Sequence, residues 1–284
     1  MARPGIQKHL EIAPLLRCPL CQAPLSAAAS SVRCDRGHDF AISAKGFLNL
    51  IPHQSPLKGY DEAFFASRQR IMEHGYYRDV QTAVVNAVGE RTDAPVIVDA
   101  GCGEGSYAKA IAQALGPAPI APTVLGLDIA KEGIRVAARG GGIVRWLVAD
   151  LANIPLADSS VDVVLNIFTP ANYAEFLRVL KPGGMLIKVI PAPLHMHELR
   201  ELAGEQLIKA GFVDHGVAEH LERHMRIVSR TRVTQTSPAA PEDTADLVRM
   251  SPVAFDINQR ELDLASLTSI TVDAEIICAQ FASA

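Results

Sequence analysis

The sequence predicts an α/β protein with a doubly wound, mostly parallel sheet that follows a small N-terminal module. The 284 residues suffice for two structural units, and 49% of them are hydrophobic against 20% charged, as in folded globular proteins. From residue 96 onward, apolar segments with strand character alternate with segments of helical periodicity. This alternation is typical of a parallel sheet with helices on both of its faces.

Composition narrows the class of protein. No segment approaches the run of about eighteen apolar residues that a membrane helix needs. Only the short apolar cluster from Ile12 to Leu16 stands where a signal peptide would carry a longer one. We therefore expect a cytoplasmic protein with no membrane partner. Three of the five cysteines fall within seventeen residues, which favours a metal site or free thiols over a disulfide framework.

The N-terminal module, residues 1–56, is rich in turn residues and too short to fold on a hydrophobic core of its own. Cys18 and Cys21 form a C-x2-C pair, and Cys34 and His38 follow as C-x3-H after twelve intervening residues. This spacing supplies four tetrahedral zinc ligands, and such a site is structural because no position remains open for catalysis. The alternative is three buried cysteines beside a surface histidine.

The other elements follow in order along the chain. Apolar positions between Tyr60 and Val88 predict one or two helices, broken near Gly75, in a helical connector over residues 57–92. The main domain is then residues 93–284, and its last two strands are expected to be antiparallel edge strands. Its predicted strands are 96–100, 123–129, 143–150, 161–168, 185–191, 225–236 and 269–281, and its predicted helices are 106–115, 131–139, 173–180, 197–210 and 242–250.

A glycine-rich turn joins the first strand of the main domain to a helix. The segment reads VIVDAGCGEG and contains Asp99, Gly101, Gly103 and Gly105. Glycines at such a turn let a ligand approach the backbone, and the helix N-terminus offers unpaired N–H groups. The turn therefore predicts a ligand site, and the alternative is a purely structural tight turn.

The same region indicates what kind of ligand binds. The dinucleotide fingerprint would require glycine at position 106, where the chain has Ser106, and the Lys-Ser/Thr pair of a P-loop is absent, so phosphate binding is disfavoured. Asp128 ends the next strand, where a carboxylate can accept hydrogen bonds from both hydroxyls of a ribose. The ligand inferred is one with a ribose and without a pyrophosphate.

These segments resemble the motifs of class I S-adenosylmethionine-dependent methyltransferases, which have a Rossmann-like fold. The matching segments are DAGCGEG, LGLDI, VADLANIPLADSSVD and LKPGGMLIKV. Over nearly the whole chain, the sequence further resembles the 23S ribosomal RNA (guanine-N1)-methyltransferases. The segments that carry this narrower resemblance are, in order, CPLC, CDRGH, KGFLNLIP, HGYY, DAGCGEG, IFTPAN, PAPLHMHEL and MSPVAF.

The resemblance implies a function and a set of site residues. It implies methyl transfer from S-adenosylmethionine to N1 of a guanine in a 23S rRNA hairpin, and zinc bound by the four Cys and His residues named above. The residues implied to contact the cofactor, beyond the Asp99, Gly101 and Gly105 of the turn, are Tyr77, Gly103, Glu104, Asp128, Asp150 and His195. Without the resemblance, His195 is more typical of a satisfied histidine and Tyr77 of a core aromatic. The sequence identifies no catalytic residue that accepts the N1 proton.

Charge distribution assigns a role to the N-terminal module. Residues 1–59 carry seven Lys and Arg against three acids, which leaves the remainder with a net charge of −8. With Arg17, Arg33 and Arg36 beside the zinc ligands, we expect the module to recognise RNA; the alternative is an ordinary solvated surface. Two rival functions are a small-molecule methyltransferase and a zinc-dependent RNA-binding module with a vestigial cofactor pocket. A homodimer is compatible with the sequence, which does not decide the oligomeric state.

Overall fold

The computed structural model describes residues 4–51, 57–89, 96–116, 121–204, 216–251 and 262–280. Its centre is an eight-stranded sheet with the strand order β10-β11-β9-β8-β5-β6-β7-β4. The strands are β4 (Phe47–Asn49), β5 (Val96–Ala100), β6 (Thr123–Asp128), β7 (Arg145–Val148), β8 (Val161–Ile167), β9 (Leu180–Pro191), β10 (Arg226–Pro238) and β11 (Ser269–Gln280). Pairing is parallel from β4 to β9, whereas β11 is antiparallel to both β9 and β10. The doubly wound sheet and its antiparallel edge are thus confirmed.

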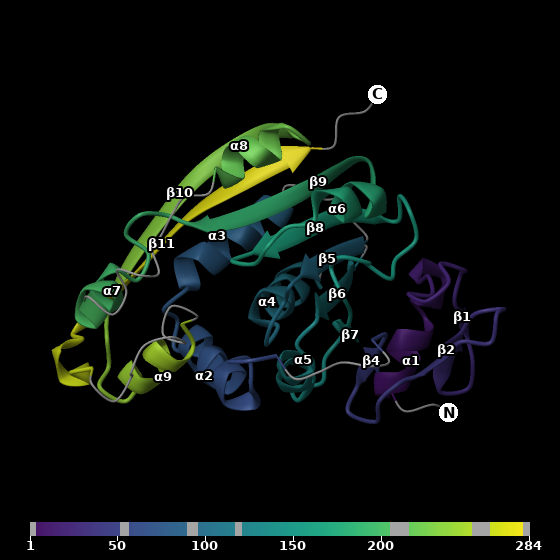
Figure 1. Ribbon diagram of the computed structural model, residues 1–284, viewed down its shortest axis with the longest axis horizontal. Helices are drawn as coiled ribbons and strands as arrows, with labels where there is room; N and C mark the ends of the chain where they lie inside the picture. Colours follow the sequence, from purple (N-terminus) through teal and green to yellow (C-terminus); the bar gives the residue numbers. More distant parts are fainter. Residues whose placement is uncertain are drawn as a thin grey trace.

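Helices connect and cover these strands, as Figure 1 shows. They are α1 (Pro4–Leu10), α2 (Glu62–Glu73), α3 (Arg78–Gly89), α4 (Ser106–Leu115), α5 (Lys131–Ala138), α6 (Tyr173–Val179), α7 (His197–Ala203), α8 (Val217–Glu222) and α9 (Thr244–Arg249). The break predicted near Gly75 separates α2 from α3, because Gly75 has a φ of 83°. The predicted helix over 197–210 is described to residue 203, and residues 205–210 lie outside the described part of the chain.

Strand β9 is longer than predicted. It begins at Leu180 rather than at residue 185, so the segment KPGG continues the strand and the preceding helix ends at Val179. Pairing with β8 shifts register between Val161 and Val163, which accommodates the extra residues. From Gly184 to Val189 every residue of β9 is buried, as expected for a central strand covered on both faces.

The N-terminal module is continuous with the main domain. Its three short antiparallel strands, β1 (Ser26–Ala27), β2 (Ser31–Arg33) and β3 (Asp39–Ala41), lead into β4, which pairs in parallel with β7. In Figure 1 the module lies at the β4 edge of the sheet, opposite β10. Its buried Leu16 and Val32 belong to the same apolar cluster as Leu147 of β7. The module and the sheet therefore share one hydrophobic cluster.

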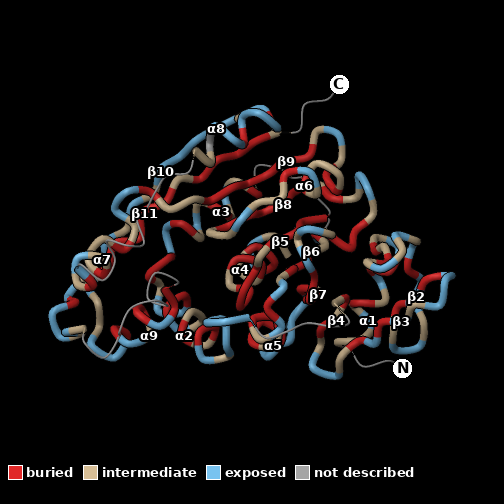
Figure 2. The backbone as a smooth tube through the Cα atoms, viewed as in Figure 1, coloured by how far each residue is buried: buried red, intermediate tan, exposed pale blue. Residues whose placement is uncertain are grey.

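The hydrophobic core follows the sheet, whose inner strands are buried in Figure 2 while most of β10 is exposed. Trp146 of β7 is fully buried, and its indole occupies the space that a Cβ on Gly105 or Gly126 would need. Two glycines thus make room for one large side chain beneath the turn between β5 and α4. Among the described residues, no helix is both long and apolar enough to cross a membrane.

Candidate active site and metal centre

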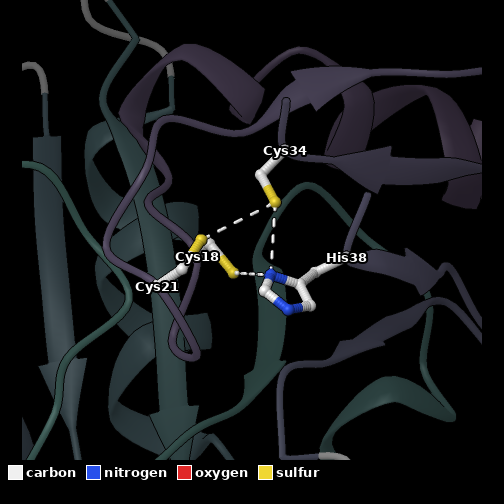
Figure 3. A group of neighbouring side chains, drawn as sticks. All are labelled: Cys18, Cys21, Cys34 and His38. Carbon is white, nitrogen blue, oxygen red and sulfur yellow. Dashed lines mark hydrogen bonds between the residues drawn. The ribbon is translucent and has the colours of Figure 1, made fainter. Parts of the chain in front are cut away.

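The four predicted metal ligands converge in the N-terminal module. The ligand atoms of Cys18, Cys21, Cys34 and His38 all lie within 4.8 Å of one another (Figure 3). Two tight turns bring them together: the Gln22 N–H donates to the Cys18 carbonyl, and the Gly37 N–H donates to the Cys34 carbonyl. Gly37 has a φ of 85°, which explains the glycine in the segment CDRGH.

The distances between these atoms fit a tetrahedral zinc site. A zinc ion with Zn–S bonds near 2.3 Å and Zn–N bonds near 2.05 Å would separate its ligands by about 3.8 Å for sulfur pairs and about 3.6 Å for sulfur and nitrogen. In the structure, the Cys21 and Cys34 sulfurs are 3.8 Å apart, and His38 Nδ1 is 3.4 Å from the sulfurs of Cys18 and Cys34. His38 therefore presents Nδ1, and the three-sulfur, one-nitrogen donor set fits a structural zinc.

The glycine turn between β5 and α4 has three left-handed residues. Gly101, Gly103 and Gly105 have φ values of 86°, 56° and 82°. A Cβ on Gly101 would lie 2.7 Å from Thr169, so this glycine lets two loops meet. A Cβ on Gly103 would meet only the ring of Phe65, at 3.5 Å. Gly101 and Gly105 are thus required by packing, whereas Gly103 is buried beneath Phe65 and is required by its left-handed φ.

Two carboxylates frame this turn. Asp128, at the end of β6, accepts hydrogen bonds from the backbone N–H of Gly103 (2.8 Å) and of Ala130 (2.7 Å). Asp99 is 2% exposed, and its Oδ2 is buried without a hydrogen-bond partner among the described residues. Burial, followed by the charges of Glu104 and Asp128, raises the pKa of Asp99 to about 7. An unpartnered buried oxygen is the kind of group whose hydrogen bonding a polar ligand completes.

The remaining predicted cofactor residues lie to either side. Glu104 is 1% exposed and forms an ion pair with Arg68 of α2, with a distance of 3.0 Å between Nε and Oε2. Asp150 is exposed at the end of β7, where its Oδ1 accepts from the Ala152 N–H. No sequence signal singled out Arg68, because its partner is 36 positions away and an arginine on an amphipathic helix is common.

A cavity of about 370 Å³ opens beside the Arg68–Glu104 pair, where β8 and β9 end. Its wall is aromatic: Phe168 stacks on His195 with ring centroids 5.1 Å apart, and Tyr77 meets Phe168 edge-on at 6.0 Å. The described residues that line the cavity are Arg68, Tyr77, Phe168, Thr169, Pro170, Lys188, Val189, Ile190, Pro191, His195, Met196, Leu199, Arg200, Val217, Met250 and Ser251. Of the segment MSPVAF, residues 252–255 lie outside the described part of the chain.

The titratable groups of the cavity have strongly shifted pKa values. Burial, assisted by the positive charge of Arg68, lowers the pKa of His195 to about 4, and its Nδ1 accepts the Asp273 N–H at 3.4 Å. Burial raises the pKa of Tyr77 to about 12. At neutral pH both side chains are therefore uncharged. The structure brings the rings of Tyr77 and His195 together at the cavity, with their centroids 6.1 Å apart.

Lys188 is a further cavity residue that the sequence analysis missed. It stands within the apolar strand β9, is 4% exposed, and hydrogen-bonds Asn166 of β8 and the carbonyl of Thr169. The sequence offers one signal for it, a lysine inside the apolar segment MLIKVIP. An apolar strand predicts that this lysine is buried, and charged residues are rarely fully buried without a partner.

The sequence also matches known families and proteins. Residues 98–188 match the family described as "Methyltransferase domain", and residues 16–56 match the family described as "RlmA, N-terminal", a zinc ribbon. A chain in the complex between the Haloferax volcanii Trm112 methyltransferase activator and a methyltransferase shares the fold, with a TM-score of 0.50 and 16% identity over 81% of this chain and 100% of that one.

Two curated proteins match over most of their length. YxjB of Bacillus subtilis, provisionally named a 23S rRNA (guanine-N(1)-)-methyltransferase, is 32% identical over 93% of this chain and 96% of its own. The 23S rRNA (guanine(748)-N(1))-methyltransferase of Streptomyces fradiae is 30% identical over 87% of this chain and 88% of its own. With a zinc-ligand cluster, a glycine turn and a class I sheet in the matching positions, the chain belongs to the family of 23S rRNA (guanine-N1)-methyltransferases.

Proposed function

We propose that the protein transfers a methyl group from S-adenosylmethionine to N1 of a guanine exposed in a 23S rRNA hairpin. The observation that carries the proposal is the aromatic-walled cavity at the ends of β8 and β9, next to the glycine turn. In open α/β sheets, ligands bind outside the carboxyl ends of the strands. A flipped base would find there the ring faces on which bases stack.

The cofactor would bind across the turn. S-adenosylmethionine supplies an activated methyl group, so the protein mainly aligns the reactants and excludes water. Asp99 offers an unpartnered oxygen, and the oxygens of Asp128 retain lone pairs beyond the two N–H groups that they already accept. Arg68 is a buried cation held by Glu104, and it is suited to an anionic group such as the cofactor carboxylate.

The domain boundaries proposed from the sequence assign RNA selection, placement of site residues and cofactor binding to three separate segments. Residues 1–56 would select the RNA, residues 57–92 would carry Arg68 and Tyr77 to the site, and residues 93–284 would hold the cofactor. Of the three arginines beside the zinc ligands, Arg17 pairs with Asp158 and Arg33 with Asp39, whereas Arg36 is exposed. An exposed guanidinium on a rigid zinc site can contact phosphates or stack on unpaired bases.

Mass spectrometry of nucleosides from 23S rRNA tests the function. A strain that lacks the gene should lose one N1-methylguanine, and the intact gene should restore it. The variant Gly103→Val should restore none, because a β-branched side chain is strained at a φ of 56° and would crowd the Phe65 ring that covers the turn. Unchanged N1-methylguanine in the deletion strain would overturn the proposal and favour a small-molecule substrate.

A further inference from the structure

Lys188 is held rigidly at the wall of the cavity. Its Nζ donates hydrogen bonds to Asn166 Oδ1 and to the Thr169 carbonyl, the latter at 2.6 Å. The Asn166 amide nitrogen in turn donates to the carbonyls of Ala100 (3.3 Å) and Pro170 (3.1 Å). Because both of those partners are acceptors, the Asn166 oxygen must face Lys188. The amine is therefore fixed by two neutral oxygens.

Among the described residues that line the cavity, no acid offsets the charge of Lys188. The other titratable residues among the described lining are Arg68 of α2, Tyr77 before α3, and His195 and Arg200 after β9, and no Asp or Glu is among them. On β11, Ile277 lies opposite Lys188, and the two acids of that strand, Asp273 and Glu275, are paired with arginines of β10. Burial alone lowers the pKa of Lys188 to about 8.

Geometry leaves the amine one free direction. A neutral amine nitrogen has four tetrahedral positions, here filled by Cε, the two donated N–H groups and one lone pair. Since the two oxygens belong to the wall and Lys188 lines the cavity, the lone pair is left for a ligand within it. Phe168 lines the same cavity, so a base stacked on its ring would occupy the space into which this lone pair points.

The other titratable groups of the cavity are poor proton acceptors. The Nδ1 lone pair of His195 already accepts the Asp273 N–H, and Tyr77 keeps its proton because burial raises its pKa. The guanidinium groups of Arg68 and Arg200 are hydrogen-bond donors and have no acceptor for the proton. Among the described lining residues, Lys188 is the group whose pKa lies near the operating pH, which is where general bases work best.

We propose that the Lys188 amine is the base that removes the N1 proton of the target guanine. This inference rests on the proposed function. The N1–H bond breaks and its proton joins the amine lone pair, so that Lys188 becomes an ammonium. The electron pair left on N1 forms the bond to the methyl carbon, and the carbon–sulfur pair returns to the sulfur, which becomes a neutral thioether. The sulfonium charge is thereby replaced by the charge on Lys188.

The test compares Lys188→Met with Lys181→Met, a lysine at the start of the same strand that lies outside the cavity lining. Single-turnover methylation of an rRNA hairpin by the wild type should rise with pH and level off near pH 8. Lys188→Met should be roughly 10²- to 10⁴-fold slower, the usual contribution of a general base, and should lose the plateau. Its affinity for S-adenosylmethionine should be unchanged, and Lys181→Met should retain the wild-type profile.

A second measurement requires neither a variant nor turnover. Competitive acetylation of the wild-type protein with acetic anhydride, followed by peptide mass spectrometry, reports the fraction of neutral amine at each pH. Lys188 should titrate near pH 8, below the value of about 10.4 that is usual for a free lysine amine. If Lys188→Met fails to fold, Lys188→Ala rescued by small primary amines replaces it, and the rescued rate should follow the basicity of the amine.

The outcomes separate the two proposals. A folded Lys188→Met variant with the wild-type rate and pH profile, or a Lys188 that titrates at the pH of a free lysine amine, would overturn the role of Lys188 and leave the proposed function standing. A wild-type protein that forms no N1-methylguanine on any rRNA hairpin would overturn the proposed function, and the role of Lys188 with it.

Discussion

Asp128→Ala tests how the glycine turn is held. In the structure the carboxylate accepts the N–H groups of Gly103 and Ala130, and it thereby fixes both the turn and the entry into α5. A buried N–H left without a partner costs about 1 to 3 kcal/mol, so two of them cost about 2 to 6 kcal/mol. Burial also raises the pKa of Asp128, and removing a desolvated charge offsets part of this loss. We therefore expect the variant to be less stable by about 1 to 4 kcal/mol.

The same substitution should weaken cofactor binding. Losing a charged hydrogen-bond partner costs about 1.5 to 3 kcal/mol, which corresponds to a roughly 10- to 160-fold higher Kd for S-adenosylmethionine. Isothermal titration and urea unfolding measure the two effects. The matched control is Asp128→Asn, which keeps one oxygen acceptor and the shape of the side chain, and which should lie between the wild type and Asp128→Ala in both measurements.

The size of the two effects decides the role of Asp128. If Asp128→Ala lowers stability but binds S-adenosylmethionine as tightly as the wild type, Asp128 only braces the turn, and the contact with the ribose is refuted. If neither the unfolding midpoint nor the Kd changes, the two backbone hydrogen bonds contribute nothing measurable to stability or to cofactor binding, and the prediction is refuted.

Three other substitutions test separate parts of the molecule. Cys34→Ser should reduce the bound zinc and make the N-terminal module more susceptible to proteolysis while the sheet stays folded, because metal binding supplies folding free energy to the module. Elemental analysis and limited proteolysis measure these effects. Full zinc content in the variant would contradict the prediction. The double substitution Arg33→Gln and Arg36→Gln should weaken RNA binding and leave cofactor affinity intact. The slope of the logarithm of the RNA binding constant against the logarithm of salt concentration should become shallower by roughly 0.7 to 0.9 for each phosphate that is no longer neutralised. An unchanged slope in a filter-binding titration would show that other residues recognise the RNA. Gly105→Ala should unfold at a lower urea concentration, since its Cβ would overlap the Trp146 indole at a φ of 82°, and a wild-type midpoint would show that the indole moves freely.

The features that the sequence alone predicted are local in the chain. The zinc ligands lie in two short pairs, each closed by its own turn, so their spacing alone carries the geometry. The glycine turn and the Asp128 that follows it are likewise set within one βαβ unit. Alternation of strands and helices then predicted a parallel sheet, because the period of apolar residues is a property of each segment.

The pairing of distant segments was decided only by the tertiary structure. Nothing in the segment KGFLNL shows that β4 would pair with β7, about one hundred residues away, because pairing depends on which strand is left uncovered at the sheet edge. Only the tertiary structure shows that Arg68 and Lys188 line the cavity, where Arg68 pairs with Glu104 and Lys188 lies between Asn166 and Thr169. Their pKa values and partners arise from loss of water and from neighbours on other elements, and neither is encoded in the residues adjacent to them in the chain.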